Sequence, residues 1–341
     1  MRAKGEYTLG AMISLHQMLS IFLQVILPIL MIIGMGALIQ RFFPLNLPTL
    51  SKINVYLLVP VFLFVRVSTA NLSWGQMGGI VLAIVLPLVL MGLPLLAVLR
   101  QAKISPETIA AIMVGGLIFN AGNFGIPVAE LHYGKAGGEV QALVAMTSNL
   151  CIWCLAYVVI AIAQGKGGWS AAVGYFKLPM IYVLVLAFGM RLARENDVTL
   201  PDWAMPAAKS VWSALEMVAL AVIPLALITL GAQLAQQARW PRWRVIGPVV
   251  ILKLVALPVV TAGVVWAMGL WPWPGAMIIV ASAAPTAVNI LLLTIELEGD
   301  AHTAADSVFW TTLLSSITVT ICMAIVDAMG GGPPGWSLTT P

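Results

Sequence analysis

Two stretches that combine glycine, proline and asparagine inside apolar segments are the parts of this sequence that could do chemistry. The first, residues 115–127, has the sequence GGLIFNAGNFGIP, and the second, residues 281–289, has the sequence ASAAPTAVN. Glycine weakens a helix, proline removes a backbone donor, and a buried asparagine needs hydrogen-bond partners. Each stretch therefore predicts an interrupted helix, whose irregular backbone at membrane depth must be buried in protein or line a watery cavity.

The two halves of an interrupted helix present opposite partial charges at the break. The first half ends in free carbonyls and the second begins with free amides, and each end carries the equivalent of roughly half an electron charge. Proline is pre-organised for the first turn of a helix, so we expect Pro127 and Pro285 near the starts of the second halves. Two converging amide ends would bind an anion, whereas the carbonyl ends could equally hold Na⁺.

Asparagines beside such breaks suit a carboxylate ligand, because an amide can donate to the carboxylate and still accept from the backbone. Glycine allows ligand and backbone to approach closely. Taken alone, either break could be a proline kink packed against neighbouring helices, and Asn149 could serve interhelical hydrogen bonding; two breaks in one chain favour a transport site. The predicted substrate-binding residues are Asn120, Asn123, Gly125, Pro127, Asn149, Pro285, Thr286 and Asn289.

The composition is that of a polytopic membrane protein. Of the 341 residues, 61% are hydrophobic and only 9% are charged, with a mean hydropathy of +1.00, whereas soluble domains carry roughly a quarter charged residues. The net charge of +4 comes without a basic, aromatic-rich cluster, so no nucleic-acid partner is expected. Cys151 and Cys154 lie in an apolar run without a second ligand pair, which favours packing over metal or redox chemistry.

Ten apolar segments long enough, or nearly so, to cross a bilayer follow one another along the chain. They span residues 18–40, 50–68, 77–99, 107–132, 139–164, 174–193, 207–236, 243–268, 274–299 and 305–328. Outside them we expect an N-terminal tail (1–17), a short cytoplasmic loop (165–173) and a disordered C-terminal tail (329–341).

The positions of the two breaks predict an inverted repeat. Pro127 and Pro285 are 158 positions apart, close to the spacing between the starts of the first and sixth segments. The sequence therefore predicts an all-α fold of two five-helix repeats, residues 18–164 and 174–328, with helices 4 and 9 broken and crossing. Because five is odd, the second repeat enters from the opposite face, an architecture that places the substrate near the midplane.

Positive residues bias the predicted orientation. Loops after the odd-numbered helices hold nine of them: Arg41, Lys52, Arg100, Lys103, Lys166, Lys177, Arg239, Arg242 and Arg244. The other side holds six: Arg2, Lys4, Lys135, Arg191, Arg194 and Lys209. The odd loops are therefore placed in the cytoplasm and both termini outside.

The motifs at the breaks resemble those of the auxin efflux carrier family. Residues 120–127 (NAGNFGIP), followed by HYG at 132–134, look like its helix-4 motif. Residues 284–289 (APTAVN), ELEGD at 296–300 and TTLLS at 311–315 are similar to its helix 9–10 region. The resemblance covers essentially the whole ten-helix chain.

This resemblance implies a secondary carrier with a ten-helix inverted-repeat fold, a transport part that contains the crossing helices, and a four-helix scaffold or dimerisation part, with a homodimer as a candidate assembly. Family members carry auxin in plants, and malate, malonate or other small organic anions in bacteria. Only about ten residues, around 165–174, join helices 5 and 6, whereas plant members have a long hydrophilic loop there. This argues against auxin itself and for a bacterial-type carrier of small carboxylates in the inner membrane, with no cofactor and with H⁺ or Na⁺ as the candidate coupling ion.

Rival functions need features that the sequence lacks or leaves open. A membrane enzyme such as an intramembrane protease needs a nucleophile–base pair or metal ligands at membrane depth. The three histidines lie near ends of spans, and no HExxH or GxSxG motif occurs, so no enzymatic activity is expected. A receptor or scaffold with the carrier fold, or a Na⁺-coupled carrier of another solute, stays open.

Three further polar residues are assigned structural roles. Lys253 lies within helix 8, about a turn or two from the predicted cytoplasmic end, and we expect it to extend to that surface, although an ionisable residue inside a membrane also predicts function. His302 and Asp306 open helix 10, and an acidic residue there is expected to cap the helix.

Overall fold

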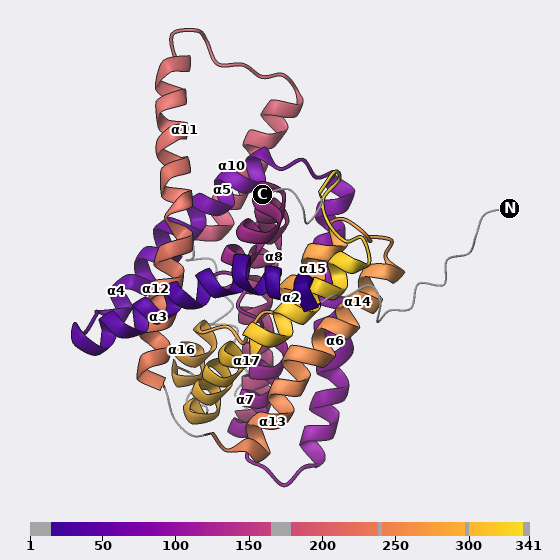
Figure 1. Cartoon of the computed structure of the whole chain (residues 1–341). Coiled ribbons are helices and arrows are strands. Elements are labelled where there is room, and N and C mark those ends of the chain that lie inside the picture. Colours follow the sequence, from indigo (N-terminus) through magenta and orange to yellow (C-terminus); the bar gives the residue numbers. More distant parts are fainter. Residues whose placement is uncertain (1–14, 165–178, 238–240, 297–299, 337–341) are drawn as a thin grey trace, which may run out of the picture.

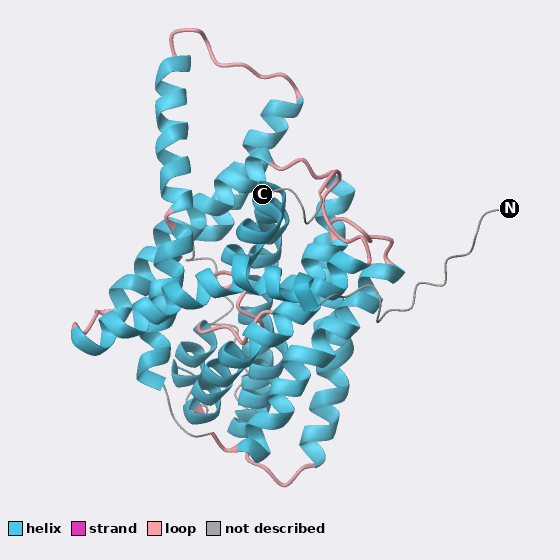
Figure 2. Ribbon diagram, viewed as in Figure 1, coloured by secondary structure: helices cyan, strands magenta, loops and turns pink. Residues whose placement is uncertain are grey.

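A computed structural model describes residues 15–164, 179–237, 241–296 and 300–336 of the chain (Figures 1 and 2). These residues form helices joined by turns and loops, with one isolated β-bridge and no strand among them. The prediction of an all-α fold is thus confirmed for the described residues. The predicted loop at 165–173 and most of the predicted N-terminal tail lie outside them.

The elements of the first half include two π-helical segments, η1 and η2. In chain order they are α2 (Leu15–Ile21), η1 (Phe22–Ile26), α3 (Leu27–Phe42), α4 (Leu47–Ile53), η2 (Asn54–Leu58), α5 (Val59–Thr69), α6 (Trp74–Gln101), α7 (Pro106–Leu117) and α8 (Gly125–Gln164).

The second half has one further π-helical segment. Its elements are α10 (Pro179–Glu195), α11 (Met205–Leu220), α12 (Val222–Gln237), α13 (Trp243–Ile251), η3 (Leu252–Ala256), α14 (Leu257–Ala267), α15 (Gly275–Ser282), α16 (Asn289–Glu296) and α17 (Ala301–Ala328).

Six continuous helical rods in the described residues are long and apolar enough to cross a membrane. They are Leu15–Phe42, Leu47–Thr69, Trp74–Gln101, Met205–Gln237, Trp243–Ala267 and Ala301–Ala328. In Figure 1, α3, α4, α11 and α12 gather on the left and α6, α13 and α14 on the right, while α7, α8, α16 and α17 lie between them. The chain is therefore a multi-pass membrane protein.

Each π-helical segment ends two residues before a proline. The prolines are Pro28 after η1, Pro60 after η2 and Pro258 after η3. Proline lacks the backbone donor and its ring clashes with the carbonyl four residues earlier, so the preceding turn widens while the helix continues. Widened turns of this kind recur at functional sites, and here they carry Asn54 in η2 and Lys253 in η3.

Both predicted helix breaks are present. Helix α7 ends at Leu117 and α8 begins at Gly125, while α15 ends at Ser282 and α16 begins at Asn289. Helix α8 contains a sharp turn at Gly134, where φ is 58° and ψ is −147°. Glycine adopts this left-handed conformation without steric cost, and the turn falls between the segments that the sequence assigns to helices 4 and 5.

Asp300 is the residue that caps α17. Its Oδ1 accepts from the backbone amide of Thr303 at 3.0 Å, and its Oδ2 accepts from the hydroxyl of Thr108 at 3.1 Å. The prediction that Asp306 and His302 cap this helix is wrong, because the helix begins at Ala301. Instead, His302 Nδ1 and Asp306 Oδ2 lie 3.3 Å apart, one turn along the helix.

The charge on Asp300 is expected to make folding depend on pH. Burial raises the pKa of this carboxyl, but hydrogen bonds from Thr303 and the nearby Arg242 outweigh burial and hold the pKa below its ordinary value. A carboxyl of this kind stabilises the fold above its unfolded pKa, near 3.9, and the contribution is lost as the pH falls through the lower folded pKa. Asp300→Asn is therefore expected to lower the melting temperature at pH 7 and to flatten its decline below about pH 4.

Differential scanning fluorimetry between pH 3 and pH 7 measures this effect. Asparagine still caps a helix, so the variant removes the charge and keeps the cap. Asp202→Asn, in the exposed loop before α11, is the matched control and should follow the wild-type curve. An Asp300→Asn curve parallel to the wild-type curve would contradict the electrostatic role.

The described part of the predicted C-terminal tail is ordered by contacts with the second half of the broken helix. Residues 329–336 form turns, and the ring of Trp336 lies 5.1 Å from the rings of both His132 and Tyr133. His132 and Tyr133 also contact the carboxylate of Asp327 near the end of α17, at 3.1 Å and 3.2 Å. The ring contacts of Trp336 and the backbone hydrogen bonds from Gly330 and Gly331 to the end of α17 therefore place this segment, where the Gly/Pro composition alone predicted disorder.

Candidate substrate site at the helix crossing

The two breaks meet through their backbones. The amide of Asn120 donates to the carbonyl of Pro285 at 2.6 Å, and the amide of Ala287 donates to the carbonyl of Ile118 at 3.3 Å. Phe119 and Thr286 thereby form an isolated antiparallel bridge. Because each extended segment supplies the other with partners, four backbone groups that the breaks release are satisfied without water.

Side chains from neighbouring helices hold the crossing in place. Thr286, which is fully buried, donates its hydroxyl to the carbonyl of Gly115 at 2.7 Å. Its backbone amide donates to the hydroxyl of Thr311 on α17 at 2.9 Å. From α8, Gln141 donates to the carbonyl of Ala121 at 2.6 Å. The predicted substrate residue Thr286 is thus engaged in the crossing itself.

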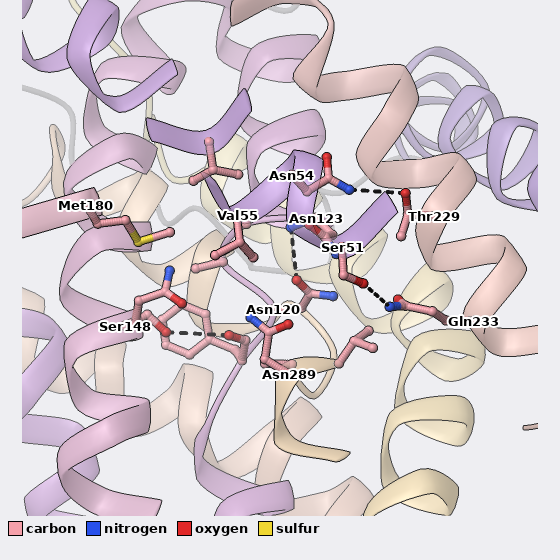
Figure 3. A pocket seen from close by; sticks show the side chains of 17 residues that line it. Ser51, Asn54, Val55, Asn120, Asn123, Ser148, Met180, Thr229, Gln233 and Asn289 are labelled. Atoms are coloured by element: carbon pink, nitrogen blue, oxygen red, sulfur yellow. Dashed lines mark hydrogen bonds between the residues drawn. The ribbon is translucent and has the colours of Figure 1, made fainter. Parts of the chain in front are cut away.

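A polar cavity lies on one side of the crossing, against η2, α10 and α12 (Figure 3). The space open to the centres of water molecules is about 40 Å³, enough for roughly three waters. None of the lining residues is ionisable. They are Ser51, Asn54, Val55, Val59, Phe119, Asn120, Ala121, Gly122, Asn123, Ser148, Asn149, Met180, Thr229, Gln233, Ala287, Val288 and Asn289.

Asn120 has one half of its amide occupied and the other half unpaired. Its Oδ1 accepts from the backbone amide of Asn123 at 3.0 Å, which identifies the other amide atom as the nitrogen. That Nδ2 is buried and has no hydrogen-bond partner among the described residues. An unpaired buried donor costs about 1–3 kcal/mol, so Asn120 is poised to donate to an acceptor in the cavity.

Asn54 offers the complementary group. The hydroxyl of Thr229 donates to the carbonyl of Leu225 at 2.6 Å, so it must accept from Asn54 Nδ2, which lies 3.1 Å away. Asn54 Oδ1 is then a buried acceptor without a partner among the described residues. The cavity therefore combines an unpaired donor with an unpaired acceptor, a set that fits a ligand bearing both a carboxylate and a hydroxyl or carboxylic acid group.

Four of the eight predicted substrate residues line this cavity: Asn120, Asn123, Asn149 and Asn289. Asn149 donates to the carbonyl of Ala145 in its own helix at 2.8 Å, which leaves its amide oxygen for the cavity. The side chains of Asn123, half-buried, and Asn289, exposed, have no hydrogen bond within the described part of the chain. These two amides are free to meet a ligand.

The other four predicted residues do not line this cavity: Gly125, Pro127, Pro285 and Thr286. Pro127 is the third residue of α8, as expected for a proline in the first turn of a second half-helix. The same prediction for Pro285 is wrong, because α16 begins four residues later, at Asn289. Pro285 instead lies in the extended segment, where its carbonyl accepts from Asn120.

Sequence reasoning missed the opposite wall of the cavity. Ser51 and Asn54 come from α4 and η2, Met180 from α10, and Thr229 and Gln233 from α12. Two signals in the sequence could have indicated this wall. One is a lone asparagine, Asn54, in an apolar segment, and the other is the pair Thr229 and Gln233, which are four residues apart and so share a helix face.

Lys253 lies beside the crossing and does not reach the cytoplasmic surface. The side chain is fully buried, with its Nζ 4.7 Å from the ring centroid of Phe119 and 3.4 Å from the carbonyl oxygen of Ser282. The prediction that Lys253 extends to the surface is wrong, because the widened turn of η3 and the packing of η3 against α7 direct it inward.

The fold and the cavity together define a multi-pass membrane protein with a polar site at the crossing of two broken helices. A protein-family model described as "Membrane transport protein" matches residues 170–323, slightly less than half of the chain. The matched part contains Lys253, the second break and most of α17. None of the curated proteins compared with this chain matches it.

Proposed function

We propose that this chain is a secondary transporter of the auxin efflux carrier type, which moves small organic carboxylate anions across a bacterial inner membrane by alternating access around the crossing of helices 4 and 9. The observation that carries the proposal is the meeting of two helix breaks, through backbone hydrogen bonds at Asn120 and Ala287, beside a cavity lined by five asparagines. Paired broken helices of this kind are typical of secondary carriers.

The ligand class follows from the groups that line the cavity. The asparagine amides donate to carboxylate oxygens, and the start of α16 at Asn289 adds the positive end of a helix dipole. The unpaired acceptor at Asn54 favours a ligand that also donates. A small hydroxy acid or a dicarboxylate carrying one proton meets both requirements, and malate and malonate are representative probes.

Alternating access requires the cavity to change size and exposure. The cavity has space for roughly three waters, which is less than the volume of a dicarboxylate with seven or more heavy atoms. We therefore infer that the cavity is contracted in this conformation. The cavity lies between the crossing on one side and η2, α10 and α12 on the other. Movement of one group against the other would widen the cavity and open it to either face of the membrane.

The proposed topology has ten spans in two inverted five-helix repeats, with both termini outside the cytoplasm. In this arrangement α7 with the start of α8 forms span 4, and α15 with α16 forms span 9. The bias of positive residues toward the odd loops supports the orientation. The four-helix scaffold then comprises spans 1, 2, 6 and 7, in which α12 packs against α3 and α10 packs against α5, and it offers a surface for a homodimer.

Uptake into proteoliposomes tests the transport proposal. Purified protein is reconstituted, and uptake of radiolabelled malonate and malate is measured with imposed pH or Na⁺ gradients, against protein-free liposomes. We expect saturable uptake of at least one dicarboxylate above the protein-free rate. Binding of both probes without flux would assign the chain to a receptor or scaffold, and neither binding nor flux would reject a carboxylate ligand.

A further inference from the structure

Lys253 presents a buried ammonium group that the proposed carrier mechanism does not yet use. Its side chain is 0% exposed and lies inside the span formed by α13, η3 and α14. Removing an ammonium from water costs several kcal/mol unless partners compensate, and an ionisable residue within a membrane span marks function by default. Its surroundings therefore bear on what the site binds.

The carboxylates of the neighbouring helix α17 are engaged elsewhere. Asp306 lies 3.3 Å from His302 and Asp327 lies 3.1 Å from His132, and no ion pair of the described residues includes Lys253. The contacts of the ammonium are instead the carbonyl of Ser282 and the face of the Phe119 ring. Both are groups that attract a cation without neutralising it.

The contact between Lys253 and the carbonyl of Ser282 places the ammonium at the end of a half-helix. Ser282 is the last residue of α15, so its carbonyl belongs to the negative end of the first half-helix at the second break. A free carbonyl end at a helix break is where a carrier can hold Na⁺. In this chain a tethered ammonium occupies that end.

The position of Phe119 connects this charge to the cavity. Phe119 lines the cavity, and its ring centroid lies 4.7 Å from Lys253 Nζ. Since contacting heavy atoms lie within about 4 Å, a ligand atom on the Phe119 ring would lie within about 10 Å of the ammonium. The lining itself carries no charge, so the ammonium of Lys253, on the far side of the Phe119 ring, would attract an anion bound there.

We propose that Lys253 is the cation of the substrate site, which occupies the carbonyl end of α15 in place of a coupling Na⁺ and raises the affinity of the neighbouring cavity for anions across Phe119. The inference rests on the proposed carboxylate transport. At an effective dielectric constant of about 20, a unit charge about 8–10 Å away changes the affinity for an anion roughly 10- to 30-fold.

Four proteins test the proposal: wild type, Lys253→Met, Lys253→Arg and Lys209→Met, the last removing an exposed lysine of α11 as a charge-matched control. The equilibrium constant for malonate, the same constant for the neutral analogue malonamide, and the melting temperature without ligand are measured for each in detergent. We expect Lys253→Met to weaken malonate binding roughly 10- to 30-fold, to leave malonamide binding unchanged, and not to lower the melting temperature. Lys253→Arg and Lys209→Met should bind malonate as the wild type does.

Two results would overturn the role of Lys253 while leaving carboxylate transport intact. The first is that Lys253→Met binds malonate with wild-type affinity, or that it loses affinity for malonate and malonamide equally and melts at a lower temperature. Either outcome would assign Lys253 a packing role. The other needs no variant: malonate binding by the wild-type protein that strengthens when Na⁺ replaces choline would mean that a separate cation is required. If the wild type binds neither malonate nor malate, the proposed function fails and this inference fails with it.

Discussion

Asn123→Ala is expected to weaken malonate or malate binding roughly 10- to 100-fold, because a hydrogen bond to a charged ligand is worth about 1.5–3 kcal/mol. Asn123 lines the cavity, and its side chain has no hydrogen-bond partner within the described residues. Its removal should therefore leave the melting temperature of the ligand-free protein nearly unchanged. Equilibrium binding and scanning fluorimetry on the same preparation measure the two quantities, and Asn289→Ala should behave in the same way.

Asn120→Ala provides the contrast that separates binding from scaffolding. Asn120 Oδ1 accepts from the amide of Asn123 at 3.0 Å, so alanine removes a backbone partner in the break as well as the unpaired donor. This variant should lower both affinity and melting temperature, with loss of a capping side chain costing roughly 1 kcal/mol. A large melting shift for Asn123→Ala with unchanged affinity would instead leave the half-helix amides as the anion-binding groups.

The sequence was sufficient to locate the crossing because its signals are local. Glycine, proline and asparagine disfavour a continuous helix wherever they occur, so the breaks at 118–124 and 283–288 follow from residue type alone. Their pairing was predicted because Pro127 and Pro285 are separated by nearly the same number of residues as the starts of the first and sixth apolar segments. The backbone bridge between Phe119 and Thr286 agrees with that expectation.

The remainder of the site depends on packing between distant segments, which no local pattern records. Asn54 meets Thr229 across 175 positions of sequence, and neither segment shows a break. The short distance in sequence between Lys253 and the end of its span predicted that its side chain extends to the cytoplasmic surface. The direction of its side chain depends on a widened turn before Pro258 and on Phe119 and Ser282, which reach it only in the folded protein.

The contact between α3 and α12 shows the same dependence on packing, at two glycines. A Cβ atom at Gly231 would overlap the carbonyl oxygen of Ile33 and lie 3.0 Å from the amide nitrogen of Ala37. A Cβ at Gly36 would overlap the carbonyl of Ile228 in the opposite direction. Small residues let the backbones of membrane helices approach closely, and van der Waals packing is then a main source of their association.

Gly231→Ala is therefore expected to destabilise the protein strongly. The added methyl group meets backbone atoms, which cannot move aside as a flexible side chain can, and overpacking of this kind costs about 1–3 kcal/mol or more. The melting temperature without ligand should fall by roughly 3–10 °C. Malonate affinity of the fraction that remains folded should change less than in Asn123→Ala, because Gly231 does not line the cavity.

Gly34→Ala is the matched control for this prediction. Gly34 lies in the same helix α3, but a Cβ atom there would meet nothing within 4 Å. Alanine is a better helix former than glycine by about 1 kcal/mol, so this control should leave the melting temperature unchanged or raise it. The contrary result is that both Gly231→Ala and Gly34→Ala melt at or above the wild-type temperature. It would mean that α3 and α12 separate easily and cannot form the rigid wall against which the crossing moves. A large fall for Gly231→Ala alone would support that wall as the fixed part of the carrier.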